Sequence, residues 1–407
     1  MKCRHCNAPL THKFLDLGFA PPSNAYLSRS ELTAPEKHYP LVVMVCDHCW
    51  LVQTQDYAAA SELFDSKYAY FSSTSSGWLA HAAQYVESIT KKLSLGSNSL
   101  VIEVASNDGY LLKNFIAANI PCLGIEPTDS TADAAERIGI PVIREFFGEQ
   151  LGDKLASNGQ SADLVVGNNV LAHVPDINDF IRGVKAVLKP TGTVTLEFPH
   201  LMQLLLHNQF DTVYHEHFSY LSLGTVSKIL DASGLRVFDV EELSTHGGSL
   251  RVYACHAEDS RARQISVDEV LTKELDNGLQ SLRTYQEFQD KANRVKDDFL
   301  LFLIEQKRAG KTVAAYGAAA KGNTLLNYAG VKPDLLPFVC DAAQSKQNQF
   351  MPGSHIPILS PEVLAANRPD FLIILPWNIA QEVKMQNSEI ALQGTQFVTA
   401  VPRLCVS

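Results

Sequence analysis

A strand, a turn and a helix predicted over residues 101–116 constrain this chain more than any other feature. Val101–Val104 is an apolar run with the length of a buried strand. A turn of small and polar residues follows, and Tyr110–Ile116 has a helical pattern. Such a unit directs backbone N–H groups and the positive end of a helix toward a ligand. We therefore expect a ligand site where this strand ends.

The ligand expected at this turn is an adenosine compound. A second apolar run, Cys122–Ile125, ends at Glu126, whose carboxylate can accept both hydroxyls of a ribose. Ala105 and Asn107 stand where nicotinamide-binding proteins need glycine, so a pyrophosphate cannot come as close to the backbone. S-adenosylmethionine, which has no phosphates, fits better. A purely structural turn is the alternative.

Length and charge exclude several classes of protein. A chain of 407 residues, 46% hydrophobic and 19% charged, indicates a globular protein of two or three domains. The net charge of −10 argues against nucleic acid as the main partner, because that binding depends on Lys and Arg. No apolar run has transmembrane length, and the N-terminus lacks the apolar region of a signal peptide. We expect a cytoplasmic protein with no membrane partner.

Two C-x-x-C pairs predict a structural zinc site near the N-terminus. Cys3 and Cys6 form one pair, and Cys46 and Cys49 form the other. Four thiolates brought together tetrahedrally hold Zn²⁺ without an open position, so the site should stabilise and not catalyse. The neighbouring histidines are alternative ligands, and unpaired cytosolic cysteines are the alternative interpretation. A polar and aromatic loop at 68–76 follows, either a lid over a ligand or a linker.

Alternating strands and helices after the first turn predict a doubly wound, mostly parallel sheet. Strands are expected at 163–167 and 193–198, with a helix at 177–188 between them. Ligands bind such sheets at the carboxyl ends of the strands. Four polar residues should lie just past such ends: Asn168, His173, Glu197 and His200.

The segment 211–220 gathers groups for acid–base chemistry. Tyr214, Glu216 and His217 supply a proton donor, an acceptor and a possible base in one place. Packed or exposed histidines are the alternative. Further along, His246 opens a glycine turn before a predicted edge strand at 250–255, where Arg251 could hold a polar ligand, unless this is a plain hairpin.

A third part of the chain repeats the strand–turn–helix pattern. Residues 261–308 have a helical pattern, with Leu271, Leu275, Leu279 and Leu282 on one face, and are expected to form an arm. A strand at 311–316 then runs into a glycine turn that carries Lys321. Small residues, a cation and a helix N-terminus suit a phosphate. A structural Rossmann-like domain without a site is the alternative.

The fold predicted from these parts is α/β, with three domains. A small zinc-binding domain is expected over 1–66 and a Rossmann-like domain that binds S-adenosylmethionine over 67–256. A helical arm and a second Rossmann-like domain are expected over 257–407.

The order of these motifs resembles the nucleotide-sugar C-methyltransferases, which build branched-chain deoxysugars. The likeness rests on the four-cysteine module and on E-V-x-S-N-D-G-Y-L-L, Y-H-E-H, H-G-G-S-x-R and Y-G-A-A-A-K-G-N-T, and it covers essentially the whole chain. It implies S-adenosylmethionine in the central domain and a nucleotide diphosphate sugar, dTDP-linked or GDP-linked, between that domain and the C-terminal one. Ala105 departs from the family, where glycine is expected.

The resemblance also implies roles for individual residues. Active-site positions would be Tyr68, His173, Tyr214, Glu216 and His217. The cofactor would be lined by Glu103, Ser106, Asn107, Asp108, Gly109, Glu126, Phe146, Phe147 and Asn168. The residues that would meet the nucleotide diphosphate are Lys321, Asn323, Asp341 and Lys346. Further candidates for substrate contacts, by their positions at strand ends and in the glycine turn, are Glu197, His200, His246, Ser249 and Arg251.

The implied reaction is C-methylation beside the ketone of a 4-keto-deoxysugar, at C3 in preference to C5. A base removes the acidic proton and the carbon of the enolate attacks the sulfonium methyl group. We expect His217 to be the base, because imidazole is neutral near pH 7. Glu216, if burial raises its pKa, and Tyr214 are alternatives. His173 is expected to stabilise the enolate.

Two other classes of protein remain open on sequence grounds. A nicotinamide-dependent sugar oxidoreductase would also have two Rossmann-like halves. A zinc-ribbon nucleic-acid methyltransferase would share the cysteine module, although the acidic balance disfavours it. A monomer is compatible with the sequence.

Overall fold

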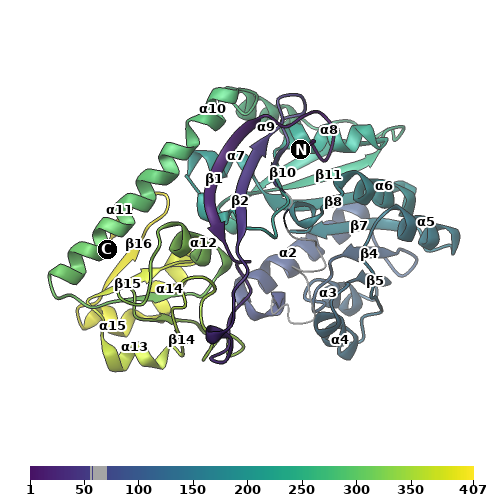
Figure 1. Ribbon diagram of the computed structural model, residues 1–407. Helices are drawn as coiled ribbons and strands as arrows, with labels where there is room; N and C mark the ends of the chain where they lie inside the picture. The colour runs from purple at the N-terminus through teal and green to yellow at the C-terminus, as the bar shows by residue number, and fades with distance from the viewer. Residues whose placement is uncertain (56, 58–70) are drawn as a thin grey trace.

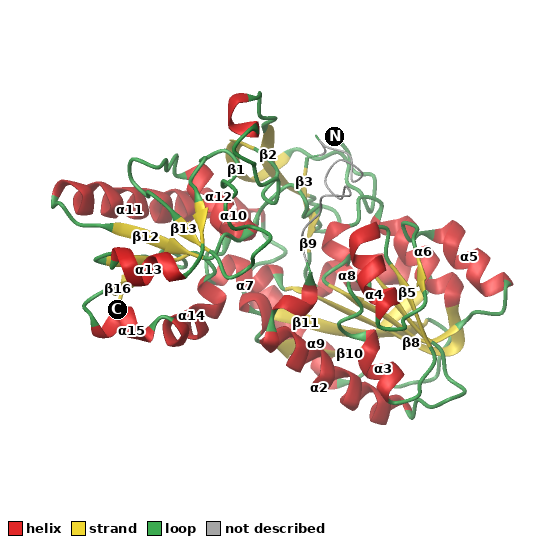
Figure 2. Ribbon diagram, turned by 90° about the horizontal axis from the view of Figure 1, so that it is seen from below, coloured by secondary structure: helices red, strands yellow, loops and turns green. Residues whose placement is uncertain are grey.

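The computed structural model describes residues 1–55, 57 and 71–407, and its strands form three sheets. Figures 1 and 2 show the first sheet lying between the other two, with the central sheet on one side and the C-terminal sheet on the other. The architecture is α/β with a small N-terminal cysteine module, as predicted.

The first sheet is antiparallel and joins two distant parts of the chain. Its order is β1-β2-β3-β9, with β1 at His12–Ala20, β2 at Tyr39–Val45, β3 at Val52–Thr54 and β9 at Ser219–Tyr220. Because β9 directly follows the segment with Tyr214, Glu216 and His217, pairing of β9 with β3 holds that segment against the N-terminal module.

The central sheet has the order β10-β11-β8-β7-β4-β5-β6, and its strands from β8 to β6 are parallel. Val101 and Ile102 are adjacent in β4 and lie in different core clusters, because successive side chains of a strand point to opposite faces. The strand bounds are β4 Val101–Val104, β5 Cys122–Ile125, β6 Val142–Ile143, β7 Ala162–Asn168, β8 Leu188–Pro199, β10 Leu235–Leu243 and β11 Ser249–His256.

Helices cover both faces of the central sheet, as a doubly wound fold requires. The core on one face includes side chains of α5, α6 and α8, and the core on the other face includes those of α2 and α3. The helix bounds are α2 Ser76–Leu93, α3 Leu112–Ala117, α4 Asp129–Arg137, α5 Glu149–Ser157, α6 Ile177–Val187, α7 Leu201–Leu206 and α8 Leu223–Ala232.

The prediction of an edge strand at 250–255 is wrong. β11 lies inside the sheet, antiparallel to β10 on one side and to β8 on the other. The edge strand is β10, at residues where no strand was predicted. Ser249–His256 is buried almost throughout, as an interior strand should be.

The C-terminal sheet has the order β14-β13-β12-β15-β16-β17, parallel except for β17. Side chains of α11 and α12 pack on one face, and those of α13, α14 and α15 pack on the other. The strand bounds are β12 Val313–Tyr316, β13 Val339–Cys340, β14 Ile358–Leu359, β15 Phe371–Ile374, β16 Gln396–Thr399 and β17 Cys405–Val406. The helix bounds are α12 Ala320–Tyr328, α13 Glu362–Asn367, α14 Ala380–Gln386 and α15 Ser388–Leu392.

The arm predicted over 261–308 is broken into three helices. These are α9 Ile265–Asp276, α10 Leu282–Gln286 and α11 Phe288–Arg308. The single leucine face is wrong, because Leu275 is 58% exposed whereas Leu279, beyond the end of α9, is buried. Gly278, at a φ of 74°, lies in the break, and this left-handed backbone cannot continue a helix.

The arm and the first sheet share one core. Phe14 of β1 lies edge-on to Tyr285 at a centroid distance of 5.5 Å and packs on Phe288 at 4.9 Å. The same apolar cluster continues into β12 and β13 of the C-terminal sheet. The N-terminal module is therefore packed against the C-terminal part through buried aromatic rings, which fixes the two parts relative to each other.

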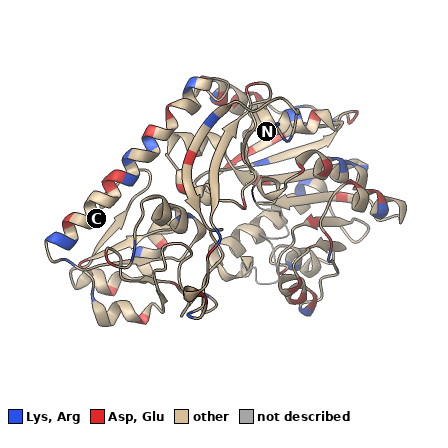
Figure 3. Cartoon of the chain, viewed as in Figure 1, with Lys and Arg blue, Asp and Glu red and all other residues tan. Residues whose placement is uncertain are grey.

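Surface charge is mixed, as Figure 3 shows along α11, where acidic and basic residues alternate. No continuous basic stripe is visible in that view. Among the described helices, none has the length and apolar character needed to cross a membrane.

Candidate active site

Four cysteine sulfurs lie together beside the first sheet. Cys3 and Cys6 precede β1, and Cys46 and Cys49 follow β2. All four Sγ atoms lie within 4.8 Å of one another, with 3.5 Å between those of Cys3 and Cys49. Sulfurs bound to one zinc at about 2.3 Å stand roughly 3.8 Å apart at the corners of a tetrahedron. The cluster fits a structural Zn²⁺ held by four thiolates.

The neighbouring histidines are directed elsewhere. His5 Nδ1 lies 2.9 Å from Asn178 Oδ1, and His48 is exposed. The four cysteines therefore complete the tetrahedron, and no position is left for a substrate.

The turn after β4 has left-handed backbone at three positions. The φ angles are 58° at Ala105, 50° at Asn107 and 77° at Gly109. A Cβ on Gly109 would stand 2.2 Å from Ile140 Cδ1, so this position requires glycine. Ala105 adopts a conformation that glycine takes without strain, so alanine is strained at this position.

Glu126 is fixed at the end of β5 by this turn. Its Oε2 accepts a hydrogen bond from the backbone N–H of Asn107 at 3.0 Å, and its Oε1 accepts one from that of Thr128 at 2.9 Å. Each oxygen keeps a further lone pair, and Glu126 lines the adjacent cavity. The carboxylate is therefore oriented to accept ribose hydroxyls.

Buried polar atoms without hydrogen-bond partners gather near the same turn. Among the described residues these include both carboxylate oxygens of Glu103, Ser106 Oγ, Asp108 Oδ1 and the side-chain amide of Asn168. Burial, reinforced by the charges of Glu126 and Asp108, raises the pKa of Glu103 well above its usual range. Such groups are costly to bury unless a polar ligand or water satisfies them. This donor and acceptor set fits the amino, carboxylate and ribose groups of S-adenosylmethionine.

The predicted cofactor residues divide into two sets. Those that line the cavity are Asn107, Glu126, Phe146, Phe147 and Asn168. Those that form the strand end and turn beside it are Glu103, Ser106, Asp108 and Gly109. Phe147 packs edge-on against Phe180 of α6, whereas Phe146 is 58% exposed at the cavity mouth.

The segment between η4 (Phe210–Thr212) and β9 presents an aromatic cluster to the same cavity. The His217 ring lies 4.0 Å from the Tyr214 ring and 4.7 Å from the His173 ring, measured between centroids. His217 Nδ1 lies 2.9 Å from the carbonyl oxygen of Thr212, and His173 Nδ1 lies 2.9 Å from that of Glu216. A carbonyl oxygen can only accept, so both rings carry their proton on Nδ1 and leave Nε2 as an acceptor.

Burial sets the protonation of these groups. It lowers the pKa of His173 to about 4, and with the charge of His173 it lowers the pKa of His217 well below the usual range. It raises the pKa of Glu216 to about 7, although hydrogen bonds from Asn24 oppose that rise. At neutral pH both imidazoles are uncharged, and Glu216 is divided between its acid and its carboxylate.

Two lysines from the C-terminal part complete the cavity wall. Lys321 Nζ donates to Asn378 Oδ1 at 2.6 Å and lies 4.5 Å from the centre of the Trp377 ring. Lys346 Nζ donates to the Ala318 carbonyl oxygen at 2.8 Å. Burial lowers the pKa of both lysines, against the opposing charges of nearby aspartates. Partly buried ammonium groups with so few anionic partners are suited to an anionic ligand.

These parts surround one cavity of about 730 Å³. The cofactor turn lines one region, the Tyr214–His217 segment lines another, and the two lysines line a third. His173 and His246 also lie on the wall. The volume suits two organic ligands in contact better than one small one.

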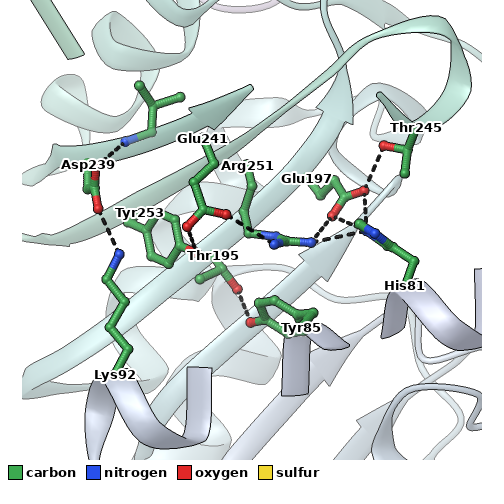
Figure 4. A network of polar contacts seen from close by, with 11 residues as sticks. His81, Tyr85, Lys92, Thr195, Glu197, Asp239, Glu241, Thr245, Arg251 and Tyr253 are labelled. Carbon is green, nitrogen blue, oxygen red and sulfur yellow. Dashed lines mark hydrogen bonds and ion pairs between the residues drawn. The ribbon is translucent and has the colours of Figure 1, made fainter. Parts of the chain in front are cut away.

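Glu197 and Arg251, predicted to bind substrate, instead form part of a buried network outside the cavity lining (Figure 4). Arg251 Nη2 lies 2.6 Å from Glu197 Oε2, and His81 Nε2 lies 2.9 Å from Glu197 Oε1. Glu197 lies within β8 and not beyond its end, directly opposite Arg251 of β11. The two charges therefore satisfy each other across the sheet and tie α2 to it through His81.

The remaining predicted substrate residues outside the lining also have structural partners. His200 Nε2 lies 2.8 Å from Glu274 Oε1, and Ser249 Oγ donates to the Thr245 carbonyl oxygen at 2.9 Å. Asn323 Nδ2 donates to the Ser23 carbonyl oxygen at 2.6 Å, and Asp341 Oδ2 accepts from the Ala318 N–H at 2.7 Å. Tyr68 lies outside the described residues.

The polar and aromatic cavity residues that were not identified from the sequence include Asn24, Ser72, Trp78 and Asn169. Asn169 follows Asn168 at the end of β7, and this place at the carboxyl end of a parallel strand could have identified it as a site residue. Trp78 stacks on His81 and lies against His246, at centroid distances of 5.0 Å in each case. Asn24 comes from the loop between β1 and β2, far from the rest of the site in sequence.

Three family descriptions match consecutive parts of the chain. Residues 3–64 match a zinc binding domain, residues 78–240 a methyltransferase domain and residues 244–402 a C-methyltransferase C-terminal domain. Among solved structures, magnesium protoporphyrin IX methyltransferase (ChlM) from Synechocystis PCC 6803 with bound SAM has 17% identity over 44% of this chain and 81% of its own, with a TM-score of 0.33. A methyltransferase from Clostridium acetobutylicum ATCC 824 has 10% identity over 44% and 92%, with a TM-score of 0.36.

A whole-chain relative has a much closer sequence. C-methyltransferase NovU from Streptomyces niveus is 35% identical over 401 residues, which span 98% of this chain and 95% of NovU. The match covers the cysteine module, the cofactor turn and the lysines of the C-terminal part together. This chain therefore belongs to the family of S-adenosylmethionine-dependent C-methyltransferases.

Proposed function

We propose that this enzyme methylates a carbon beside the ketone of a nucleotide-linked 4-keto-deoxysugar, at C3 in preference to C5. One observation carries the proposal: groups predicted to bind the cofactor, acid–base groups and two partly buried lysines line the same cavity. Methyl transfer to carbon needs a carbanion equivalent, and a hydrogen beside a ketone is the kind that a side-chain base can remove. S-adenosylmethionine supplies an electrophilic methyl group when bound.

We assign proton abstraction to His217. Its Nδ1–H is held by the Thr212 carbonyl oxygen, so the lone pair of Nε2 is available to take a proton. The low pKa keeps the His217 ring neutral and therefore able to accept a proton, although it also makes the ring a weaker base. An enolate forming beside the ring would favour its protonated form, because opposite charges attract strongly in a buried site.

The structure changes the role that we propose for His173. A neutral His173 with its proton on Nδ1 has no N–H left at Nε2 to donate to an enolate oxygen. We therefore assign His173 to accept a hydrogen bond from a substrate hydroxyl. The hydroxyl of Tyr214, stacked on His217, is the donor that we assign to the enolate oxygen. Glu216 would bind a further sugar hydroxyl as a carboxylate, or replace His217 as the base because its pKa is about 7.

Lys321 and Lys346 are proposed to bind the nucleotide diphosphate. A diphosphate would supply the negative charge that the cavity wall lacks around the two ammonium groups. It would also offset the charge of Lys321, which contributes to the low pKa of His217, so substrate binding would strengthen the base. A dTDP-linked sugar is favoured and a GDP-linked one is possible. Zn²⁺, held by four cysteines away from the cavity, takes no part in the reaction.

The direct test is incubation with S-adenosylmethionine and a panel of dTDP- and GDP-linked 4-keto sugars. Mass spectrometry should detect one added methyl group, and NMR of the product should place it on C3. A methyl group on oxygen, or turnover of 4-hydroxy sugars at the same rate, would contradict the proposal. Titration with NADH serves as a control, because tight binding of NADH would favour an oxidoreductase.

A further inference from the structure

The side chain of Glu216 is held by a residue from the N-terminal module. Asn24 Nδ2 lies 3.0 Å from Glu216 Oε1 and 2.7 Å from Oε2, so one amide group contacts both carboxylate oxygens. Glu216 is 2% exposed, and both residues line the cavity. Within the described part of the chain, no other side chain hydrogen-bonds this carboxylate. An ionised carboxylate so deeply buried needs such a donor.

Asn24 is itself held in place by the C-terminal part of the chain. It lies in the connection from β1 to β2, which contains the short 3₁₀ turn η1 (Glu31–Thr33). The Ser23 carbonyl oxygen accepts from Asn323 at 2.6 Å, and the Tyr26 hydroxyl donates to the Ala318 carbonyl oxygen at 2.6 Å. Leu27 then pairs with Phe350 through two backbone hydrogen bonds. The backbone is therefore held in place on both sides of Asn24, and this positions its side-chain amide.

We propose that Asn24 is a positioning residue that favours the ionised form of Glu216 and directs it into the cavity. The contact also links the zinc-binding module to the site of chemistry, because β1 and β2 are anchored by the cysteine cluster and carry the connection between them. The proposal rests on the proposed function only for what Glu216 does to the substrate. The ionisation of Glu216 itself can be measured without substrate.

Charged and titratable groups from three directions face Glu216. Its own segment contributes Tyr214 and His217, and the His173 ring lies edge-on to the His217 ring at a centroid distance of 4.7 Å. Tyr26 from the β1–β2 connection has its pKa raised by burial and by the charges of Asp341 and Glu216, so it stays neutral. The C-terminal part contributes Asp341, Lys321 and Lys346. The two histidines titrate well below neutrality, whereas Glu216 is expected to titrate near pH 7 and the buried Asp211, hydrogen-bonded to Trp377, near pH 6.

The experiment is a titration of Glu216 by infrared difference spectroscopy of the full chain. The carbonyl band of the protonated carboxyl is followed with pH, and the spectrum of Glu216→Gln is subtracted to assign the band. Removing the donor in Asn24→Ala should move the titration upward by about one pH unit or more. Asn24→Asp, which keeps the size and adds a like charge, should also move it upward. Tyr26→Phe is the matched control, because it removes the hydrogen bond to the Ala318 carbonyl oxygen while the hydrogen bonds from Asn24 to Glu216 and the charge near Glu216 stay the same, and it should leave the titration unchanged.

The pH dependence of methylation provides the second measurement. The acid limb of the rate profile should move upward in Asn24→Ala by the same amount as the infrared titration, and the rate should recover at higher pH. The acid limb moves upward because the hydrogen bond from Asn24 favours the charged form of Glu216, so its loss leaves Glu216 protonated to a higher pH. In a Glu216→Gln background, Asn24→Ala should produce no shift.

The possible outcomes separate the two proposals. An unchanged Glu216 titration in both Asn24 variants would overturn the positioning role. A shifted titration with an unchanged rate profile would support the positioning role and instead contradict the placement of Glu216 at the site of chemistry. An equal shift in Tyr26→Phe would show a general effect of the connection and would also overturn the role of Asn24.

Discussion

Arg251 and Glu197 face each other on β11 and β8, with Arg251 Nη2 2.6 Å from Glu197 Oε2, and both side chains are buried. Burial alone would raise the pKa of Glu197, but the hydrogen bond from His81 and the charge of Arg251 hold it below its usual value. The pair fastens β8 to β11, the strand that follows the glycine turn bearing His246. Its role in the fold is therefore structural.

Replacing Arg251 with alanine should lower the free energy of unfolding by about 3–5 kcal/mol, because it leaves a buried charge without its partner. Urea unfolding at pH 7.5 measures the loss. Since the folded pKa of Glu197 lies below its unfolded value, the pair stabilises the fold at neutral pH and that stability is lost as the pH falls through the folded pKa. Arg182→Ala, which removes an exposed ion pair with Glu149, should cost less than about 1 kcal/mol. If Arg251→Ala left the stability unchanged but weakened substrate binding, the structural role would be contradicted and Arg251 would be a substrate-binding residue.

One equivalent of zinc per chain is expected in protein purified without added metal. Cys46→Ser should lose the metal and destabilise the first sheet, because the free energy of zinc binding contributes to folding. Cys405→Ser, at an exposed cysteine outside the cluster, is the matched control and should keep the metal. Metal analysis together with thermal unfolding would show the difference. Metal-free protein of unchanged stability would contradict the zinc site.

Glu126→Ala should weaken S-adenosylmethionine binding tenfold or more. A hydrogen bond to a charged group contributes roughly 1.5–3 kcal/mol, and the substitution also releases the N–H groups of Asn107 and Thr128. Calorimetry measures the affinity. Glu136→Ala, on the exposed side of α4, should bind the cofactor normally. An unchanged dissociation constant in Glu126→Ala would place the ribose elsewhere.

Ala105→Gly should stabilise the protein by up to about 1 kcal/mol. The left-handed φ of 58° costs alanine roughly 1–2 kcal/mol, of which the flexibility of glycine in the unfolded chain cancels part. Ala80→Gly, at an exposed position inside α2, should instead destabilise by about 1 kcal/mol. Thermal unfolding of the pair should give shifts of opposite sign, and a destabilised Ala105→Gly would contradict strain at this turn.

The sequence predicted the elements whose signals are local. The strand Val101–Val104 and the end of the next strand at Glu126 follow from short apolar runs with turn residues after them. The cysteine pairs indicated zinc because the spacing of the two cysteines within each pair is a local pattern as well. Both the cofactor turn and the metal cluster were therefore predictable.

Features set by distant pairing could not be predicted in the same way. Whether β11 is an edge or an interior strand depends on β8, far away in sequence. Glu197 looked free for a ligand because its partner Arg251 lies on that other strand. Asn24 gave no signal at all, since its contact with Glu216 exists only in the folded chain. The domain limits at residues 66 and 256, and the roles of the individual site residues, stay predictions.

The most direct test of the proposed chemistry is exchange of the C–H beside the ketone with D₂O, with S-adenosylhomocysteine in place of the methyl donor. The wild-type enzyme should exchange this hydrogen, and His217→Gln should exchange it on the order of 10²–10⁴ times more slowly with cofactor binding intact. His207→Gln, at an exposed histidine, should behave as the wild type. Exchange at an unchanged rate in His217→Gln would contradict its role as the base, and loss of exchange in Tyr214→Phe alone would assign that role to Tyr214. Absence of exchange by the wild type with every 4-keto nucleotide sugar would contradict the proposed reaction.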